Sequence, residues 1–271
     1  MTSGKKRTLP KNKTRIVFLS FLLSCLFIQT TQSSQENWQQ PAFLLNSFIE
    51  IALKNEYDAD SHRVRKWESP VKVWIDHRVG EQELHTELVQ IHLNDLARIT
   101  GHSISLVPFK KQANVILVFA QFKEMKNLTH QLMGQQAVNV LRGTLCIANF
   151  KANKDQVIQQ ASIIIPADQA RMSGKLVSCV VEELTQVLGL VNDSDKVFPS
   201  IFNDKTPNTL LSGLDYILLK LLYNPKIKAG MSLVEITPIV NDLIREKSQS
   251  GEVSNAWHMA RKSPLYEMLG Y

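Results

Sequence analysis

The sequence predicts an α+β fold, in which a mixed, twisted sheet of about five strands packs on long helices and is followed by a mainly helical C-terminal part. Residues 71–76 alternate between apolar and polar side chains, as a half-buried strand does, and 113–120 are apolar nearly throughout, as in a central strand. Apolar residues recur at helical spacing over 81–100 and 174–191. Strands therefore gather in the first part of the chain, and helices flank and follow them.

The N-terminus predicts a signal peptide over residues 1–33. Six basic residues precede the first acidic one, and an apolar run at 16–28 follows them. This run is short for a bilayer span and suits the core of a signal peptide, while the small side chains of Thr31 and Ser33 favour cleavage after Ser33. An uncleaved membrane anchor and a lipid-modified Cys25 are the two alternatives.

The formal net charge of +6 belongs to this N-terminal segment. Without its six basic residues, the rest of the chain contains 25 Lys and Arg and 25 Asp and Glu. A protein with balanced charge has no general electrostatic attraction to nucleic acid, so we expect no nucleic-acid partner. Any membrane attachment is expected through the N-terminus only.

Residues 34–40 are polar and predict a flexible lead to a single domain over 41–250. Pro41 opens an amphipathic helix, because apolar side chains follow it at helical spacing: Leu44, Leu45, Phe48, Ile51 and Ala52. The connection at 58–68 is charged. We interpret three of its basic residues as a solvated face: Arg63, Arg65 and Lys66.

Further strands are predicted at 102–107, 144–150 and 161–165, from their alternation or their β-branched residues. Residues 121–142 fit neither a helix nor a strand clearly. Later helices are predicted at 211–223 and 232–247. The remaining 251–271 predict a loosely structured C-terminal tail, with four apolar side chains that can dock on the domain: Trp257, Leu265, Tyr266 and Leu269.

Cys146 and Cys179 are the two cysteines that follow the signal segment. An even pair in an exported protein favours a disulfide, and two buried free thiols are the alternative. A bridge between them would close a loop of about 30 residues and stabilise the protein by roughly 3–4 kcal/mol.

The most informative stretch is 182–193, which reads Glu-Glu-Leu-Thr-Gln-Val-Leu-Gly-Leu-Val-Asn-Asp. It resembles the zinc motif of the metzincin metallopeptidases, HExxHxxGxxH followed by an acid. Glu182, Gln186 and Asn192 occupy the three histidine positions of that motif. The resemblance therefore implies a zincin-like fold whose zinc histidines have been replaced.

Other positions of the motif are kept. Glu183 corresponds to the catalytic glutamate, Gly189 to the turn glycine and Asp193 to the final acid. Downstream, 200–203 resembles the Met-turn with Phe202 at the methionine position, and the helix that follows resembles the next metzincin helix. The similarity covers roughly residues 70–225.

A second resemblance is more specific. Arg65-Lys66-Trp67, the 182–193 stretch and Asn224-Pro225 with Gly230-Met231 resemble the proteobacterial domain of unknown function 2927 family, some of whose members are described as lipoproteins. Together with the signal segment, this resemblance implies a protein of the periplasm or cell envelope of a Gram-negative bacterium.

The substitutions change the chemistry that the motif can support. Glu182 can bind a metal, but the amide oxygens of Gln186 and Asn192 are poor zinc ligands, so zinc is not expected. Glu183 remains the one candidate catalytic residue. Calcium is not expected either, because no loop has EF-hand spacing, although Asp193 and Asp195 together with Glu182 and Glu183 would supply oxygens.

The same residues also have a simpler interpretation. The spacing of Cys179, Glu182, Glu183 and Gln186 is that of a polar stripe which any amphipathic helix presents to water. If the metallopeptidase resemblance holds, Glu182, Gln186, Asn192 and Asp193 should instead lie together in a cleft.

We therefore expect an exported protein that binds a peptide or an envelope protein without catalysis. In metzincin-like folds the edge strand beside the cleft pairs with an extended peptide, and here that strand would be 144–150. A hydrolase that uses Glu182 and Glu183 without zinc is the first alternative. A lipoprotein that acts as an envelope scaffold is the second.

Overall fold

The computed structural model describes residues 1–2, 4, 37–54, 62–141, 143–203, 205 and 208–271. The signal peptide predicted over 1–33, its cleavage after Ser33 and the lipidation candidate Cys25 lie outside the described residues, apart from three positions at the start of the chain. Within the described part, no helix has the length and apolar character that crossing a membrane requires.

A five-stranded mixed sheet forms the centre of the domain, as predicted. Its strands lie in the order β2 (Ile104–Leu106), β1 (Val71–His77), β3 (Val115–Ala120), β5 (Ile158–Pro166) and β4 (Ile147–Ala152). Neighbours pair in parallel except β4, which runs antiparallel to β5 at one edge. The apolar segment predicted to be central is the middle strand, β3, and the strand predicted at 144–150 is the edge strand β4, which begins three residues later and ends at Ala152.

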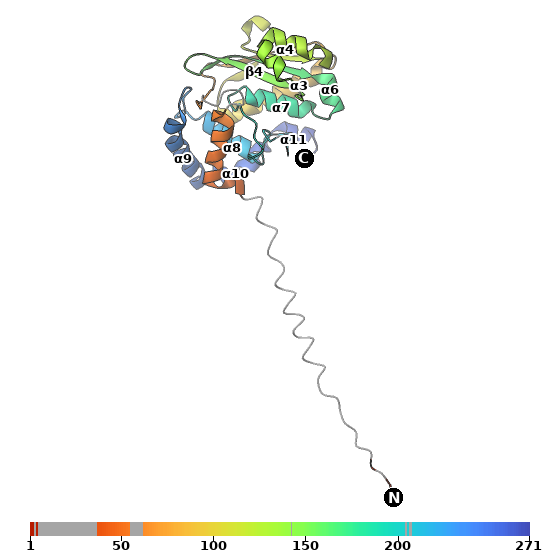
Figure 1. Ribbon diagram of the computed structural model, residues 1–271, viewed down its shortest axis with the longest axis vertical. Helices are drawn as coiled ribbons and strands as arrows, with labels where there is room; N and C mark the ends of the chain where they lie inside the picture. Colours follow the sequence, from red (N-terminus) through yellow and green to blue (C-terminus); the bar gives the residue numbers. More distant parts are fainter. Residues whose placement is uncertain (3, 5–36, 55–61, 142, 204, 206–207) are drawn as a thin grey trace. The chain divides into compact units, whose positions relative to one another are not determined.

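Helices cover both faces of the sheet, because side chains of β3 alternate between two cores. Leu117 and Phe119 belong to a large core with α3 (Gln82–Thr100) and α7 (Leu176–Gln186). Val118 belongs to a smaller core on the opposite face, under α4. The predicted ambiguity over 121–142 is resolved by two helices, α4 (Met125–Met133) and α5 (Gln135–Asn139), and α6 (Ala167–Met172) follows β5. In Figure 1, α4 lies on one side of the sheet and α7 on the other.

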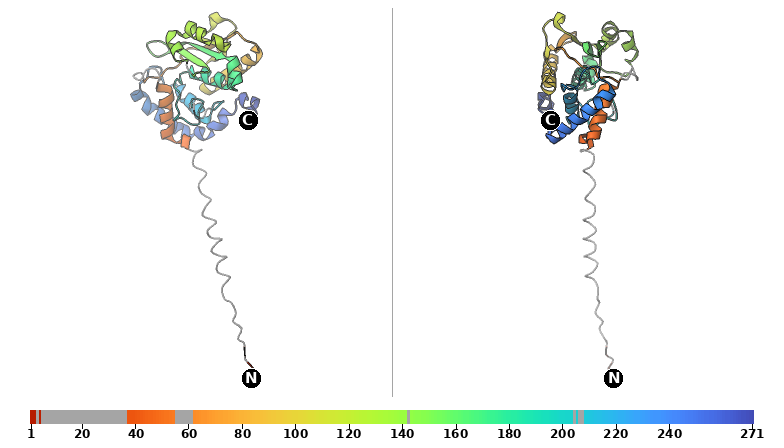
Figure 2. Two further views of the ribbon diagram at one scale, coloured as in Figure 1. Left: turned by 45° about the vertical axis from the view of Figure 1, so that its right-hand side comes forward. Right: turned by 90° about the vertical axis from the view of Figure 1, so that its left-hand side faces the viewer.

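A second group of helices continues the large core away from the sheet (Figures 1 and 2). It comprises α2 (Pro41–Phe48) with a π-helical continuation (Ile49–Leu53), α8 (Gly213–Leu222), α9 (Leu233–Gln249), α10 (Glu252–Ala260) and α11 (Pro264–Met268). Nine of the ten residues of α8 are buried, so this helix is the centre of the group.

The chain ends differ from their predictions. The expected flexible lead includes a 3-10 helix (Asn37–Gln39), and Trp38 in it is buried in the core. The expected loose tail forms α10 and α11. Both pack on the body, since the Tyr266 hydroxyl donates to the carbonyl of Leu211 at 2.8 Å and the backbone of Trp257 lies against Gly213.

Two of the basic residues before β1 also differ from the prediction of a solvated face. Arg65 and Lys66 are 5% and 7% exposed. The Lys66 ammonium donates to the carbonyls of Leu222 (2.8 Å) and Ile227 (3.1 Å) after α8, and burial lowers its pKa to about 8. These hydrogen bonds explain how a charge is tolerated in the interior, because the ammonium caps the carbonyl of Leu222, the last residue of α8, and also bonds to a carbonyl in the turn that follows.

Candidate functional site

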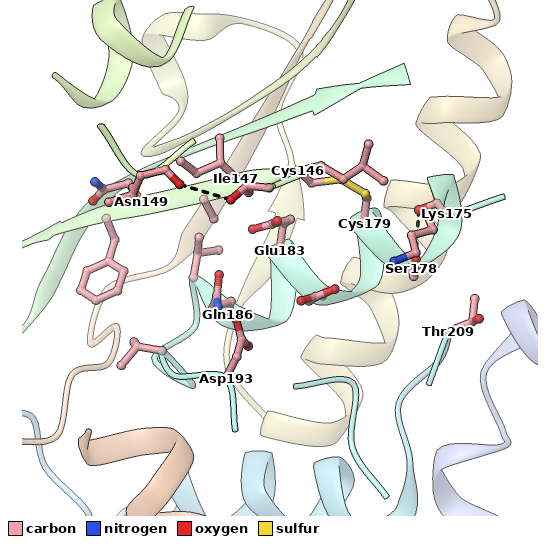
Figure 3. A pocket seen from close by; sticks show the side chains of 18 of the residues that line it. Cys146, Ile147, Asn149, Lys175, Ser178, Cys179, Glu183, Gln186, Asp193 and Thr209 are labelled. Carbon is pink, nitrogen blue, oxygen red and sulfur yellow. Dashed lines mark hydrogen bonds between the residues drawn. A yellow bond between two sulfur atoms is a disulfide. The ribbon is translucent and has the colours of Figure 1, made fainter. Parts of the chain in front are cut away.

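A cleft of about 510 Å³ lies between the edge strand β4 and helix α7 (Figure 3). The β4 wall consists of 144–150 without interruption, that is, the three residues before β4 and the first four residues of the strand, so the cleft runs along the start of the strand. Side chains from α7 and the loops around it form the other walls: Arg65, Lys175, Ser178, Glu182, Glu183, Gln186, Asp193, Asn208 and Thr209. Its volume is in the range of sites that bind small molecules or a few residues of a peptide.

A disulfide joins the two principal walls. Cys146 immediately precedes β4, Cys179 lies on α7, and their Cα atoms are 5.9 Å apart. Both half-cystines line the cleft and both are buried. The predicted bridge is therefore present, and it fixes the edge strand to the helix that carries the two glutamates.

Glu183 is the most deeply buried acid of the cleft, with 6% of its surface exposed. Figure 3 shows its carboxyl group extending from α7 towards β4. Its Oε2 atom is buried and has no hydrogen-bond partner among the described residues. Burial raises the pKa of Glu183 well above its ordinary value, and the negative charges of Glu182 and Asp193 raise it further. The polar-stripe interpretation is thus wrong for this side chain, which does not face open water.

Helix α7 ends earlier than the prediction of 174–191, and the turn after it positions Asp193. Gly189 has φ +117°, a conformation that residues with a β-carbon rarely adopt. A β-carbon there would also collide with the carbonyl oxygen of Arg65. Two further bonds hold this turn, from the Trp67 indole to the carbonyl of Val187 and from the Tyr223 hydroxyl to the carbonyl of Leu188, both at 2.8 Å.

The third histidine position of the motif does not face the cleft. The side-chain amide of Asn192 donates to the carbonyl of Glu50 at 3.0 Å, and its backbone N–H donates to the carbonyl of Ile51. Asn192 therefore anchors the loop to the π-helical turn after α2. Its neighbour Asp193 is the residue that lines the cleft.

The other predicted site residues fall into two groups. Glu182, Glu183, Gln186 and Asp193 line one cleft, as the metallopeptidase resemblance implies. The calcium alternative also named Asp195, whose carboxylate pairs with Lys205 at 2.6 Å and does not line the cleft. Within the described part of the chain, no three His, Cys, Asp or Glu side chains are grouped to hold a metal ion.

Asp215 organises the loop that resembles the Met-turn. This buried carboxylate accepts hydrogen bonds from the Ser200 hydroxyl (2.6 Å) and from the backbone of Ile201 (3.2 Å) and Ser212 (2.8 Å). Burial raises its pKa to about 6, against the lowering effect of these bonds. The loop is also joined to the chain directly after Asp193, because the carbonyl of the buried Phe202 accepts a hydrogen bond from the backbone of Ser194.

Several cleft residues were not predicted from the sequence. Arg65 belongs to a conspicuous Arg-Lys-Trp run, which could have been connected to the cleft through its place in the family resemblance. Lys175, Ser178 and Asn208 carry no local pattern that separates them from other polar residues, and only the folded chain brings them beside β4.

The comparisons with known proteins give one family. A family model described as "Protein of unknown function (DUF2927)" matches residues 41–242, about three quarters of the chain. Neither a curated protein nor a solved structure gives a significant match.

Proposed function

The chain belongs to the DUF2927 family, and from this premise we propose that it is a peptide- or partner-binding module of the cell envelope, built on a degenerate metallopeptidase-like fold and without catalytic activity. The observation that carries this proposal is the position of β4. It is an edge strand of the sheet, and its first four residues continue the wall of the cleft that begins three residues before it.

An edge strand has backbone N–H and C=O groups on one side that no other strand of the sheet uses. An extended peptide placed in the cleft can pair with them as an additional strand, which gives affinity without any metal. The disulfide between Cys146 and Cys179 supports this role, because it holds the strand at a fixed distance from α7. A rigid edge loses less entropy when the ligand pairs with it.

The kinship with metallopeptidases is supported by topology and by the residues that line the cleft. An antiparallel edge strand next to a helix that carries the motif is the arrangement that the resemblance implies. The donor set, however, does not suit zinc. Glu182 supplies a carboxylate, Gln186 an amide, and the Asn192 amide is engaged with the carbonyl of Glu50. We therefore assign the cleft no metal-dependent step.

Hydrogen–deuterium exchange tests the binding proposal. The protein is probed with peptides selected on an array of acetylated, amidated decapeptides. Bound peptide should slow the exchange of backbone amides in β4 by about tenfold or more, because paired amides exchange only when the pairing opens. The opposite edge strand, β2, is an internal control and should not change.

A pair of tryptophan variants supplies the second control. Ser178→Trp places a large side chain in the cleft and should abolish the protection of β4. Glu87→Trp adds the same side chain on the exposed surface of α3 and should leave binding intact. An array on which no peptide is retained, or a peptide that protects β2 and β4 equally, would refute the proposal.

A hydrolase that works without zinc is the second candidate, and one observation favours it. Glu183 is a buried carboxyl with a raised pKa in a cleft, which is a common property of general acids and bases. Hydrolysis of a peptide by the wild type, and its loss in Glu183→Gln with peptide binding retained, would establish this candidate over the binding module.

A further inference from the structure

The acidic side chains of the cleft suggest which ligand it binds. Glu182, Glu183 and Asp193 all line it, and Glu183 has a buried Oε2 atom without a hydrogen-bond partner among the described residues. A buried polar atom that the protein itself leaves without a hydrogen bond is costly, and such atoms in native structures need an explanation. A ligand that donates hydrogen bonds at this point would supply the missing partner.

We infer that the cleft binds a positively charged nitrogen of an extended peptide, either an ammonium or a guanidinium group, against the carboxyl group of Glu183, next to the acidic residues Glu182 and Asp193. This inference rests on the proposed function, since β4 would hold the peptide backbone while the acids select its charge. It goes further by naming the chemical class of the ligand.

The electrostatic environment favours a cation at this point. Burial makes ionisation of Glu183 unfavourable and raises its pKa, and the charges of Glu182 and Asp193 raise it further; a cation next to Glu183 would offset both effects. Glu183 is also in the last turn of α7, where the carbonyl ends of a helix attract positive charge. Hydrogen bonds from an ammonium or guanidinium group to a carboxylate are among the strongest in proteins.

Two basic residues, Lys175 and Arg65, also line the cleft. Lys175 is the N-cap residue of α7. The carbonyl of Arg65 lies against Gly189, beyond the C-terminal end of the same helix. Glu183 lies between them in the helix, and its carboxyl points to the middle of the β4 wall (Figure 3). A ligand cation at Glu183 would therefore lie opposite the strand that holds its backbone.

Isothermal titration calorimetry tests the charge preference. One peptide retained by the array is made in four acetylated, amidated forms. They differ only at one position, which is lysine, arginine, norleucine or citrulline. The lysine and arginine peptides should bind at least about tenfold more tightly than their neutral analogues, as a desolvated ion pair would give. A fifth peptide with a free N-terminal amine and no basic side chain distinguishes an α-ammonium from a side-chain cation as the recognised group.

The variants connect the preference to the acids. Glu183→Gln should reduce the preference for the charged peptides to less than about threefold, whereas Glu87→Gln on α3 should preserve it. Binding of a cation should also release protons from the cleft, which appears as a dependence of the binding enthalpy on the ionisation enthalpy of the buffer.

The outcomes separate the two proposals. Equal affinity for charged and neutral peptides would overturn this inference and leave the binding module intact. Absence of binding by every peptide would overturn both. Calcium chloride alone is the third arm: if calcium binds with the same dependence on Glu183 and displaces the peptide, the acids form a metal site and the inference is wrong.

Discussion

The main chain of Gly189 lies against the carbonyl group of Arg65, so that a β-carbon on Gly189 would overlap that oxygen. This contact brings the Arg-Lys-Trp segment to the end of α7 and turns the chain back, so that Asp193 reaches the cleft. Gly189 is thus required by two conditions at once, its φ of +117° and the neighbouring backbone.

Gly189→Ala should destabilise the protein by about 3 kcal/mol or more, because it combines backbone strain with a collision that only main-chain movement relieves. Gly101→Ala is the matched control. Gly101 also has a positive φ (69°), but nothing lies within 4 Å of the position of its β-carbon, so the cost should be only about 1 kcal/mol. Urea denaturation measures both, and equal losses would contradict the role of the Arg65 contact.

Cys179→Ser should lower the stability of the oxidised protein by about 3–4 kcal/mol, since the bridge closes a loop with a sequence separation of 33 residues. The measurement is thermal or urea unfolding in buffer without reductant. Dithiothreitol should bring the wild type to the stability of the variant and leave the variant unchanged. A variant as stable as the oxidised wild type would remove the disulfide from the energetics of the fold.

Glu183→Gln should stabilise the protein at neutral and alkaline pH. The folded-state pKa of Glu183 is raised above its ordinary value near 4.5, so the folded protein holds a proton that the unfolded chain releases. The contribution of Glu183 to wild-type stability therefore falls as pH rises above 4.5. The variant should gain up to about 1.4 kcal/mol per pH unit relative to wild type over this range.

The difference in unfolding free energy between the two proteins, measured by urea denaturation from pH 4 to pH 8, isolates this effect. Asp215, whose pKa is also raised to about 6, contributes equally to both and cancels. If the difference in unfolding free energy between the variant and the wild type stays constant across that range, Glu183 is not protonated in the folded protein.

His92 should produce the opposite dependence. This buried histidine of α3 lies 3.0 Å from both the carbonyl of Val181 and the hydroxyl of Thr185 on α7. Burial lowers its pKa from 6.5 to about 4, so the unfolded chain binds a proton that the folded protein excludes. Stability from this group is complete above pH 6.5 and is lost as pH falls to 4, by about 3 kcal/mol.

His92→Gln removes the titrating group and should flatten the acid side of the stability profile. His258→Gln, on the exposed surface of α10, is the control and should keep the wild-type slope. Urea denaturation at pH 4, 5 and 6.5 gives the comparison. An unchanged slope in His92→Gln would mean that His92 does not control acid stability.

Export of the chain should remove residues 1–33. Intact-mass analysis of the protein recovered from cells should give a mature N-terminus at Ser34. Palmitate incorporation that is lost in Cys25→Ser would contradict this outcome and establish the lipoprotein alternative.

The sheet was predictable from the sequence because its patterns are local. A strand that is apolar on both faces has to be covered on both, and β3 is the middle strand with a core on each side. The edge position of β4 and the pairing of Cys146 with Cys179 also agreed with the prediction. These elements needed only periodicity, composition and the resemblance to a known motif.

The differences arise where distant contacts decide the structure. The apolar pattern extends past Gln186 because Val187, Leu188 and Leu190 are buried, although their backbone is no longer helical. Lys66 is buried because the carbonyls of Leu222, at the end of α8, and Ile227, in the turn after it, accept its hydrogen bonds. No pattern near Lys66 in the sequence indicates those acceptors, so its charge suggested exposure to solvent.

The position of the disulfide has a consequence for when the protein can act. Both sulfur atoms belong to the walls that a ligand would contact, so oxidation completes the binding surface as well as the fold. A newly made chain in a reducing environment would have an edge strand that is not yet tied to its helix. If the cleft binds its ligand as proposed, capture should strengthen once the thiols have been oxidised, which would separate synthesis from binding in time and in place.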